Sequence, residues 1–211
     1  MNHLKAWGGM RIYFIRHGES EANILRELST RGIKHGLTEK GRSQITRLAA
    51  ELASVPRIRI YSSPLLRATE SAEILRKKLG CEISVSKALC EWDVGELEGR
   101  RDDEAWERYW QIWKDWSAEN TDSRVKGGES FKDIEARFVP FVTALVAAAS
   151  SDESLLLIGH AGLFCAALPL ILRNVDSHFA QSNGITNAAY VLAEMVDGEL
   201  ICKKWGEITL L

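Results

Sequence analysis

Short runs of apolar and β-branched residues predict the strands of this chain. The run at residues 10–16 ends at an Arg-His-Gly turn, and a second run covers residues 57–62. A third run, at residues 155–159, leads into Gly-His-Ala-Gly. Shorter strands are predicted at residues 82–85 and 88–91, and two adjacent strands at 187–195 and 199–205 around an Asp-Gly turn.

Apolar residues three and four positions apart predict helices between these strands. The predicted helices cover residues 38–55, 63–79, 102–117 and 130–149, with a further helix after residue 160. Because strands and helices alternate, we expect an α/β fold with a three-layer αβα sandwich. Its sheet is expected to be mainly parallel, with one antiparallel strand from the final pair.

The predicted helix at 102–117 carries an unusual aromatic stripe. The stripe consists of Trp106, Tyr109, Trp110, Trp113 and Trp116. It is open to three interpretations: a cap helix that buries its aromatic face on the domain, a homodimer interface, or a wall of a substrate pocket. The first is the simplest. We therefore expect one domain over residues 1–211, with a small helical cap segment at about 100–128.

Composition indicates an ordinary globular chain. It has 211 residues, of which 45% are hydrophobic and 27% charged. Lys and Arg number 27 against 29 Asp and Glu, which gives a net charge of −2. Because no basic excess exists, nucleic acid is not expected as a partner.

Neither a membrane nor a secreted location is expected. The apolar run 155–172 is long enough to raise the question of a membrane span, but Gly, His and Pro interrupt it, so we interpret it as core. Residues 1–9 lack the apolar centre of a signal peptide. The four cysteines lack the close spacing of a zinc or redox site, which predicts free thiols and a cytoplasmic protein.

Four candidate functional residues follow the ends of predicted strands. Arg16 and His17 follow the first strand, His160 follows the strand at 155–159, and Arg67 lies early in the helix after the second strand. Because the carboxyl ends of parallel strands meet at one edge of a sheet, we expect these side chains to converge. Two guanidinium forks and a helix N-terminus suit a phosphoryl group. No acidic cluster accompanies them in the sequence, so we expect neither a metal site nor a cofactor.

Five sequence blocks resemble, in order, the motifs of the histidine phosphatase superfamily, the phosphoglycerate-mutase-like group. The blocks are RHGES at 16–20, LTEKG at 37–41, SSPLLRA at 62–68, GGES at 127–130 and GHAG at 159–162. A lone Arg-His-Gly would be a weak signal, whereas five ordered blocks in their expected strand or loop context are specific. The resemblance covers about residues 10–205.

The resemblance implies a role for each residue of the predicted phosphate pocket. His17 would be the nucleophile that takes the phosphoryl group, with Arg16, Arg67 and His160 around the phosphate. Asn23, six positions after His17, would contact phosphate or substrate. Attack requires a neutral imidazole, so we expect a backbone carbonyl to hold one ring nitrogen of His17 as a donor.

The resemblance also implies that Glu91 is the proton donor, although Glu96 and Glu98 lie close enough in sequence to be alternatives. The acid must be protonated when the alkoxide leaves, and its carboxylate would then activate water. A nearby phosphate dianion and Trp92 would raise the pKa of Glu91, which predicts an acid-to-neutral pH optimum.

These residues predict a metal-independent phosphomonoesterase that acts on a small phosphorylated metabolite through a phosphohistidine. One alternative is phosphoryl transfer of the phosphoglycerate mutase type, which needs extra cations for a second phosphate. The segment 102–119 is acidic and aromatic, with only Arg108 and Lys114 basic, which favours hydrolysis. A second alternative is a non-catalytic sensor of a phosphorylated ligand.

Overall fold

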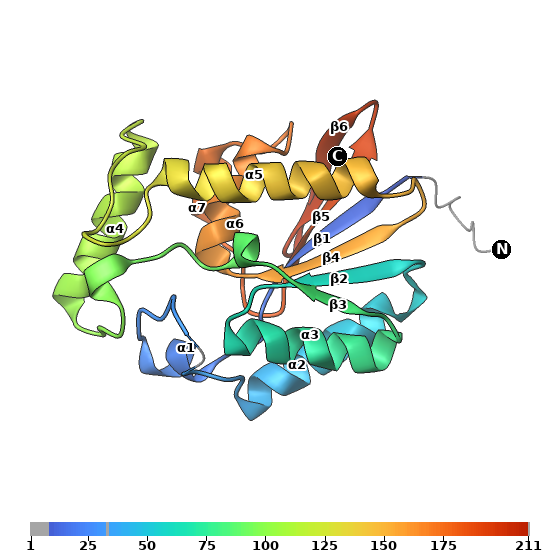
Figure 1. The fold of residues 1–211 in the computed structure, drawn as a ribbon, viewed down its shortest axis with the longest axis horizontal. Helices are drawn as coiled ribbons and strands as arrows, with labels where there is room; N and C mark the ends of the chain where they lie inside the picture. The colour runs from blue at the N-terminus through green and yellow to red at the C-terminus, as the bar shows by residue number, and fades with distance from the viewer. Residues whose placement is uncertain (1–8, 33, 211) are drawn as a thin grey trace.

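A mixed β-sheet forms the centre of the protein. The computed structural model describes residues 9–32 and 34–210, and within them the sheet has seven strands in the order β3-β2-β4-β1-β5-β6-β7 (Figure 1). The first 8 residues, and with them most of the segment examined for a signal peptide, lie outside the described residues. The strands are β1 (Arg11–Arg16), β2 (Ile58–Ser62), β3 (Ile83–Val85), β4 (Ser154–Gly159), β5 (Tyr190–Val196), β6 (Glu199–Trp205) and β7 (Ile208–Thr209).

The strand directions confirm the expected α/β sheet. β1, β2, β3 and β4 pair in parallel, and β5 runs antiparallel to β1 and β6. β5 is therefore the expected antiparallel strand, and the short β7, which pairs antiparallel with β6, adds a second strand in that direction. The prediction of a strand at residues 88–91 is wrong. Lys87–Leu89 forms a 3-10 turn instead, because the Ser86 hydroxyl accepts a hydrogen bond from the N–H of Ala88.

Helices cover both faces of the sheet (Figure 1). Alternate residues of β1 explain the two layers. Tyr13 and Ile15 pack in the cluster that holds α2 (Glu39–Glu51) and α3 (Leu66–Leu79). Ile12 and Phe14 pack in the cluster that holds α5 (Phe131–Ala148) and α6 (Ala161–Ala167). The sandwich is thus the predicted one. The helices are α1 (Glu21–Leu25), α2 (Glu39–Glu51), α3 (Leu66–Leu79), α4 (Asp103–Ser117), α5 (Phe131–Ala148), α6 (Ala161–Ala167) and α7 (Ser177–Asn183).

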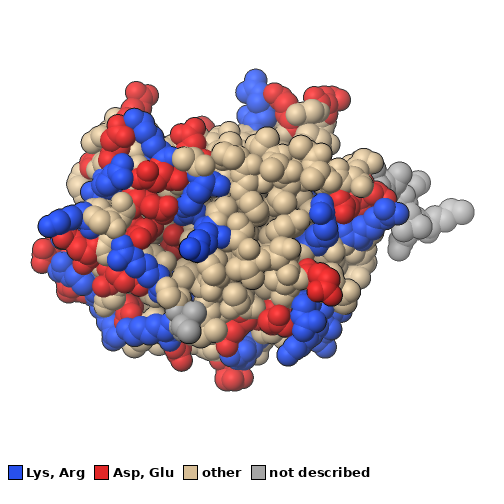
Figure 2. Space-filling model, in the orientation of Figure 1, with Lys and Arg blue, Asp and Glu red and all other residues tan. Residues whose placement is uncertain are grey.

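The apolar run 155–172 divides as expected into buried β4, a turn and α6. Among the described residues, no helix is both long and apolar enough to cross a membrane. Figure 2 shows one face of the molecule, where Lys and Arg are mixed with Asp and Glu around an uncharged area over α5 and β3. This mixture agrees with the small net charge.

The helix α4 stands at the side of the molecule toward which the parallel strands run (Figure 1). Its aromatic stripe divides into buried and exposed members. Trp113 and Trp116 are buried in the core, which confirms the cap interpretation for these two. Trp110 is 54% exposed, so that interpretation is wrong for it. The reason is that Trp110 faces a hollow beside the carboxyl ends of the strands.

Candidate active site

The structure brings the predicted site residues together at the carboxyl ends of β1, β2 and β4. Arg16, His17, Asn23, Arg67 and Glu91 line a cavity of about 150 Å³. The fully buried ring of His160 lies beside it, with its centroid 5.1 Å from the centroid of the His17 ring. Residues from four segments that are distant in sequence, at 16–23, 67, 91 and 160, therefore meet in one place. This small cavity is called the phosphate cavity below.

His17 is held in a defined orientation directly after β1. Its main-chain N–H donates to the carbonyl of Gly159 at 3.1 Å, and its Nδ1 lies 2.7 Å from the carbonyl oxygen of Gly18. Because a carbonyl only accepts, Nδ1 carries the proton, as predicted from the sequence. The lone pair therefore resides on Nε2, where it accepts a hydrogen bond from Nε of Arg67 at 3.1 Å.

The surroundings of His17 favour the neutral imidazole. Burial lowers its pKa well below the usual value, and the positive charges of Arg67 and Arg16 lower it further. His160 is similar, because burial and then Arg67 lower its pKa. Both rings are thus uncharged near neutral pH, and Nε2 of His17 is available as a nucleophile.

Two buried nitrogens of the site lack a hydrogen-bond partner among the described residues, namely Nε of Arg16 and Nδ1 of His160. An unpaired buried polar group costs about 1–3 kcal/mol, so such groups commonly mark a ligand position. One hydrogen bond orients the Arg16 guanidinium, because its Nη1 donates to the carbonyl of Ile185 at 2.7 Å. Arg67 is held similarly by the carbonyl of Ser29, at 2.7 Å from Nη2. Two guanidinium groups held in this way suit a bound oxyanion.

Glu91 follows the 3-10 turn Lys87–Leu89 in the chain, and its carboxylate lies against the first turn of α6. Its carboxylate oxygens accept from the N–H groups of Trp92 at 3.0 Å, Gly162 at 3.0 Å and Leu163 at 2.6 Å. Burial raises the pKa of Glu91 above its usual value, against the opposing effect of these donors and of Arg67. This carboxyl group can therefore hold a proton at a higher pH than an exposed glutamate.

The two alternative acids lie elsewhere. Glu96 is half-exposed and paired with Arg108 at 2.6 Å. Glu98 is occupied by Thr30, whose N–H and hydroxyl both lie 2.8 Å from Oε2. Of the three candidates, only Glu91 belongs to the lining of the phosphate cavity as the structure describes it.

Sequence reasoning missed two residues that position the predicted ones. Ser63, which was predicted to begin a helix, lies 2.9 Å from Nε2 of His160 through its hydroxyl. The helix begins instead at Leu66. Asn187 donates from Nδ2 to Oδ1 of Asn23 at 3.1 Å and to the carbonyl of His17 at 3.3 Å. Neither partner could be found from the sequence, because both contacts depend on strand order.

A buried carboxylate closes one side of the phosphate cavity. Glu27 accepts from Lys34 at 2.7 Å, from His35 at 2.8 Å and from Arg101 at 2.7 Å. Burial raises the pKa of Glu27, but the hydrogen bonds from Lys34, His35 and Arg101 outweigh this effect and lower it to about 2. This ionised group therefore ties the loop after α1 to the segment before α4.

The close approach of α6 to Glu91 predicts a sensitive position at Gly162. A methyl group there would lie 2.7 Å from Oε1 of Glu91 and 2.9 Å from the indole of Trp92. We expect Gly162→Ala to lower kcat on an alkyl phosphate about tenfold, because the carboxyl must move. The overpacking should cost about 1–3 kcal/mol of unfolding free energy. Steady-state kinetics and urea unfolding measure both, and full activity would contradict the assigned geometry.

Comparisons with known proteins agree with this geometry. A family model described as the histidine phosphatase superfamily (branch 1) matches residues 12–208. The "Probable phosphoglycerate mutase GpmB" of Salmonella paratyphi C (strain RKS4594) is 33% identical over 129 residues, which are 61% of this chain and 59% of that protein. The match therefore spans about three fifths of the length of this curated relative.

Two solved structures share the fold over nearly their whole length. The structure of mycobacterial glucosyl-3-phosphoglycerate phosphatase with VO3 has a TM-score of 0.80 and 25% identity, and the match covers 93% of this chain and 98% of that one. Bacillus stearothermophilus YhfR has a TM-score of 0.81 and 25% identity, and the match covers 95% of this chain and 98% of that one.

In the part of the chain that the structure describes, no group of three or more His, Cys, Asp or Glu is arranged to hold a metal ion.

Proposed function

Because this chain belongs to the histidine phosphatase superfamily (branch 1), we propose that it is a metal-independent phosphomonoesterase that acts through a phosphohistidine. The observation that carries the proposal is the setting of His17. Its Nδ1 proton is bound to the carbonyl of Gly18 at 2.7 Å, and its Nε2 faces Nε of Arg67 at 3.1 Å. A nucleophilic nitrogen thus lies beside a cation that can hold a phosphoryl oxygen.

The first step transfers the phosphoryl group to the protein. Nε2 of His17 forms a bond to phosphorus while the bond from phosphorus to the alcohol oxygen breaks. Protonated Glu91 gives its proton to that oxygen, so the alcohol leaves neutral. Arg16 and Arg67 stabilise the negative charge on the equatorial oxygens, and His160 lies next to them.

The second step releases phosphate. Ionised Glu91 accepts a proton from water, the water oxygen bonds to phosphorus, and the bond to His17 breaks. Glu91 thereby regains its proton, and the enzyme returns to its starting state. Splitting the hydrolysis in two replaces one difficult step with two easier ones. Two relatives support this class of reaction, since one solved relative is a phosphatase whose structure contains VO3 and a curated relative is named a phosphoglycerate mutase.

That curated relative favours phosphoryl transfer of the mutase type as the second candidate. A mutase must hold a second phosphate and keep water from the phosphohistidine. The hollow next to the phosphate cavity has Lys114 as the cation of its outer wall, and the rest of that wall is built of aromatic, apolar and neutral polar groups. Hydrolysis is therefore the better supported reaction.

The four cysteines, all free, support our further proposal of a cytoplasmic location.

One assay separates the three hypotheses. The protein is incubated in chelator with an aryl phosphate, and separately with 3-phosphoglycerate and a bisphosphate primer. We expect phosphate release from the aryl ester and no exchange of the phosphoglycerate isomers. Isomer exchange without release would support the mutase. Binding of vanadate without either reaction would support a sensor.

A further inference from the structure

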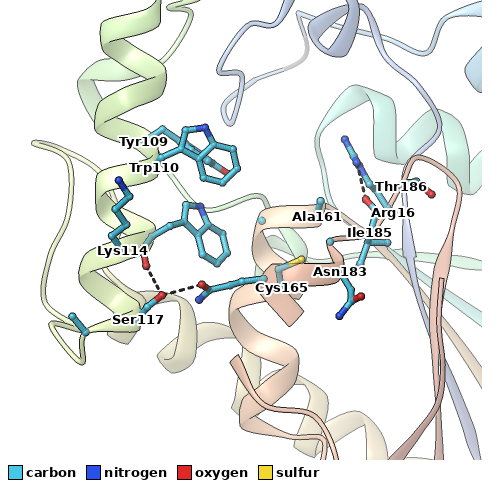
Figure 3. Close-up of a pocket in the computed structure, with 15 residues that line it drawn as sticks. Arg16, Tyr109, Trp110, Lys114, Ser117, Ala161, Cys165, Asn183, Ile185 and Thr186 are labelled. Atoms are coloured by element: carbon cyan, nitrogen blue, oxygen red, sulfur yellow. Dashed lines mark hydrogen bonds between the residues drawn. The ribbon is translucent and has the colours of Figure 1, made fainter. Parts of the chain in front are cut away.

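A second, larger hollow of about 880 Å³ opens directly beside the phosphate cavity. The two share part of their walls, namely Arg16, Tyr109, Ala161 and Gly162. Figure 3 shows Tyr109 and Trp110 extending from α4 toward α6, where Ala161 and Cys165 lie opposite. An ester whose phosphate is held at Arg16 would therefore place its alcohol part here. This hollow, between α4, α6 and residues 181–186, is called the alcohol pocket below.

The wall formed by α4 is aromatic. The Trp110 indole is 54% exposed, and its ring meets the ring of Tyr109 at right angles with centroids 4.9 Å apart. Trp113 lies deeper, at 7% exposure. The opposite wall holds Cys165, whose thiol stays neutral because burial raises its pKa to about 12. Together these groups offer a large uncharged surface and one exposed indole.

Some polar groups of the alcohol pocket are already used within the protein. The hydroxyl of Ser117 lies 2.9 Å from Oε1 of Gln181, a contact that joins α4 to α7 (Figure 3). Nδ2 of Asn183 donates to the carbonyl of Phe179 at 2.8 Å. These groups are less available to an alcohol rich in hydroxyl groups, and any hydroxyl left unpaired would weaken its binding.

The distribution of charge in the alcohol pocket also favours an apolar alcohol. Among the described lining residues, Arg16 and Lys114 carry charge, and Arg16 lies at the phosphate end. Between them the wall is built of aromatic, apolar and neutral polar groups. A pocket of this size with a mainly apolar wall is typical of sites for compact organic ligands.

We propose that the alcohol pocket binds a flat aromatic group, so that the preferred substrates are phosphomonoesters of alcohols that carry an aromatic ring. This proposal rests on the proposed phosphatase function and specifies its substrate class. The indole of Trp110 determines specificity by stacking on the ring. The phosphate cavity supplies affinity for the phosphoryl group, which all such esters share.

The test compares 2-naphthylmethyl, cyclohexylmethyl and ethyl phosphate. All three release alcohols of similar basicity, so differences in kcat/KM report the alcohol pocket rather than leaving-group chemistry. We expect the wild-type protein to prefer the naphthylmethyl ester to the ethyl ester by about tenfold or more, and to the cyclohexylmethyl ester by about threefold or more. Trp110→Ala should lower the naphthylmethyl-to-ethyl ratio about fivefold to tenfold through KM, and Trp110→Phe should restore most of it.

Glu107→Ala is the matched control, because Glu107 is an exposed residue of the same helix outside the alcohol pocket. It should leave the ratios unchanged. Equal kcat/KM for the naphthylmethyl and cyclohexylmethyl esters, or an unchanged ratio in Trp110→Ala, would overturn the aromatic pocket. Hydrolysis of ethyl phosphate and its loss in His17→Ala test the phosphatase function separately. If the wild-type protein hydrolyses none of the three esters, both proposals fail.

Discussion

Replacement of His17 by alanine is expected to lower phosphate release by about 10⁴-fold or more on every phosphomonoester. The reason is that no other nitrogen of the site has the same setting. Nε2 of His17 carries the lone pair because Nδ1 is bound to a carbonyl, and its neighbour is the Arg67 guanidinium at 3.1 Å, whereas Nε2 of His160 lies 2.9 Å from the hydroxyl of Ser63. Without Nε2 of His17, water must attack the ester directly in a cavity arranged for an imidazole.

The covalent intermediate gives a more direct measurement of the same claim. A ³²P-labelled ester, quenched during turnover, should leave label on the wild-type protein that acid removes and alkali retains, as expected for a phosphoramidate bond. The label should be absent from His17→Ala. His178→Ala is the matched control, because His178 is exposed on α7, and it should label like the wild type. Label in His17→Ala, or activity within tenfold of the wild type, would contradict the nucleophile.

Folding of the His17 variant requires its own control, because the ring is 3% exposed and lies among buried groups. Truncating a buried side chain leaves a cavity that costs about 2–4 kcal/mol. His17→Asn keeps most of the volume and one hydrogen-bonding group. We therefore expect it to unfold at a urea concentration close to the wild-type value while activity stays lost. Retained vanadate binding by this variant would show an intact phosphate cavity.

The convergence of Arg16, His17, Arg67 and His160 could be predicted from the sequence for a simple reason. Each follows a run whose apolar content indicates a buried strand, and parallel strands deliver their carboxyl ends to one edge. The prediction needed no knowledge of side-chain contacts. The same argument gave the two helical layers, because alternating strand residues must be covered on both faces.

Contacts that depend on the order of the strands in the sheet could not be predicted. Nor could the sequence show whether an apolar side chain lies in the core or in the wall of a pocket. Asn187 reaches His17 because β5 pairs with β1, which only the folded sheet defines. The helical period placed Trp110 and Trp113 on one face of α4 but did not distinguish the core from a pocket wall. Glu27 illustrates a third limit, since its three partners lie on a loop and a turn without periodic pattern.

Glu91→Gln is expected to lower kcat on an alkyl phosphate by about 10²–10⁴-fold, the usual contribution of a general acid. Glutamine preserves the shape, and its amide oxygen can still accept from Leu163, but its NH2 group cannot accept from Gly162 and it has no proton to give to the leaving alkoxide. An aryl phosphate with an acidic phenol should lose far less in the first step, because its leaving group departs as a stable anion. The variant's loss should therefore shrink steadily as the leaving group becomes more acidic.

The pH dependence follows from the two shifted groups. Burial raises the pKa of Glu91, so the protonated acid persists to a higher pH than usual, and activity falls as pH rises through that raised value. Burial lowers the pKa of His17, so the neutral nucleophile persists to a lower pH, and activity falls only below that lowered value. The optimum is therefore acid to neutral, and a flat wild-type rate on an alkyl phosphate from about pH 5 to 9 would contradict this assignment.

Two comparisons make the Glu91 assignment specific. In Glu91→Gln the decline on the alkaline side should disappear from the residual activity, because the group that titrates is gone. Glu96→Gln is the matched control, since Glu96 lies at the surface with Arg108, and it should keep both the wild-type rate and the wild-type profile. If Glu96→Gln instead loses the alkaline decline, or if Glu91→Gln loses equally on alkyl and aryl esters, the proton comes from another group. In that case the three N–H donors on Glu91 would serve to fix α6 against the phosphate cavity rather than to hold a reacting acid.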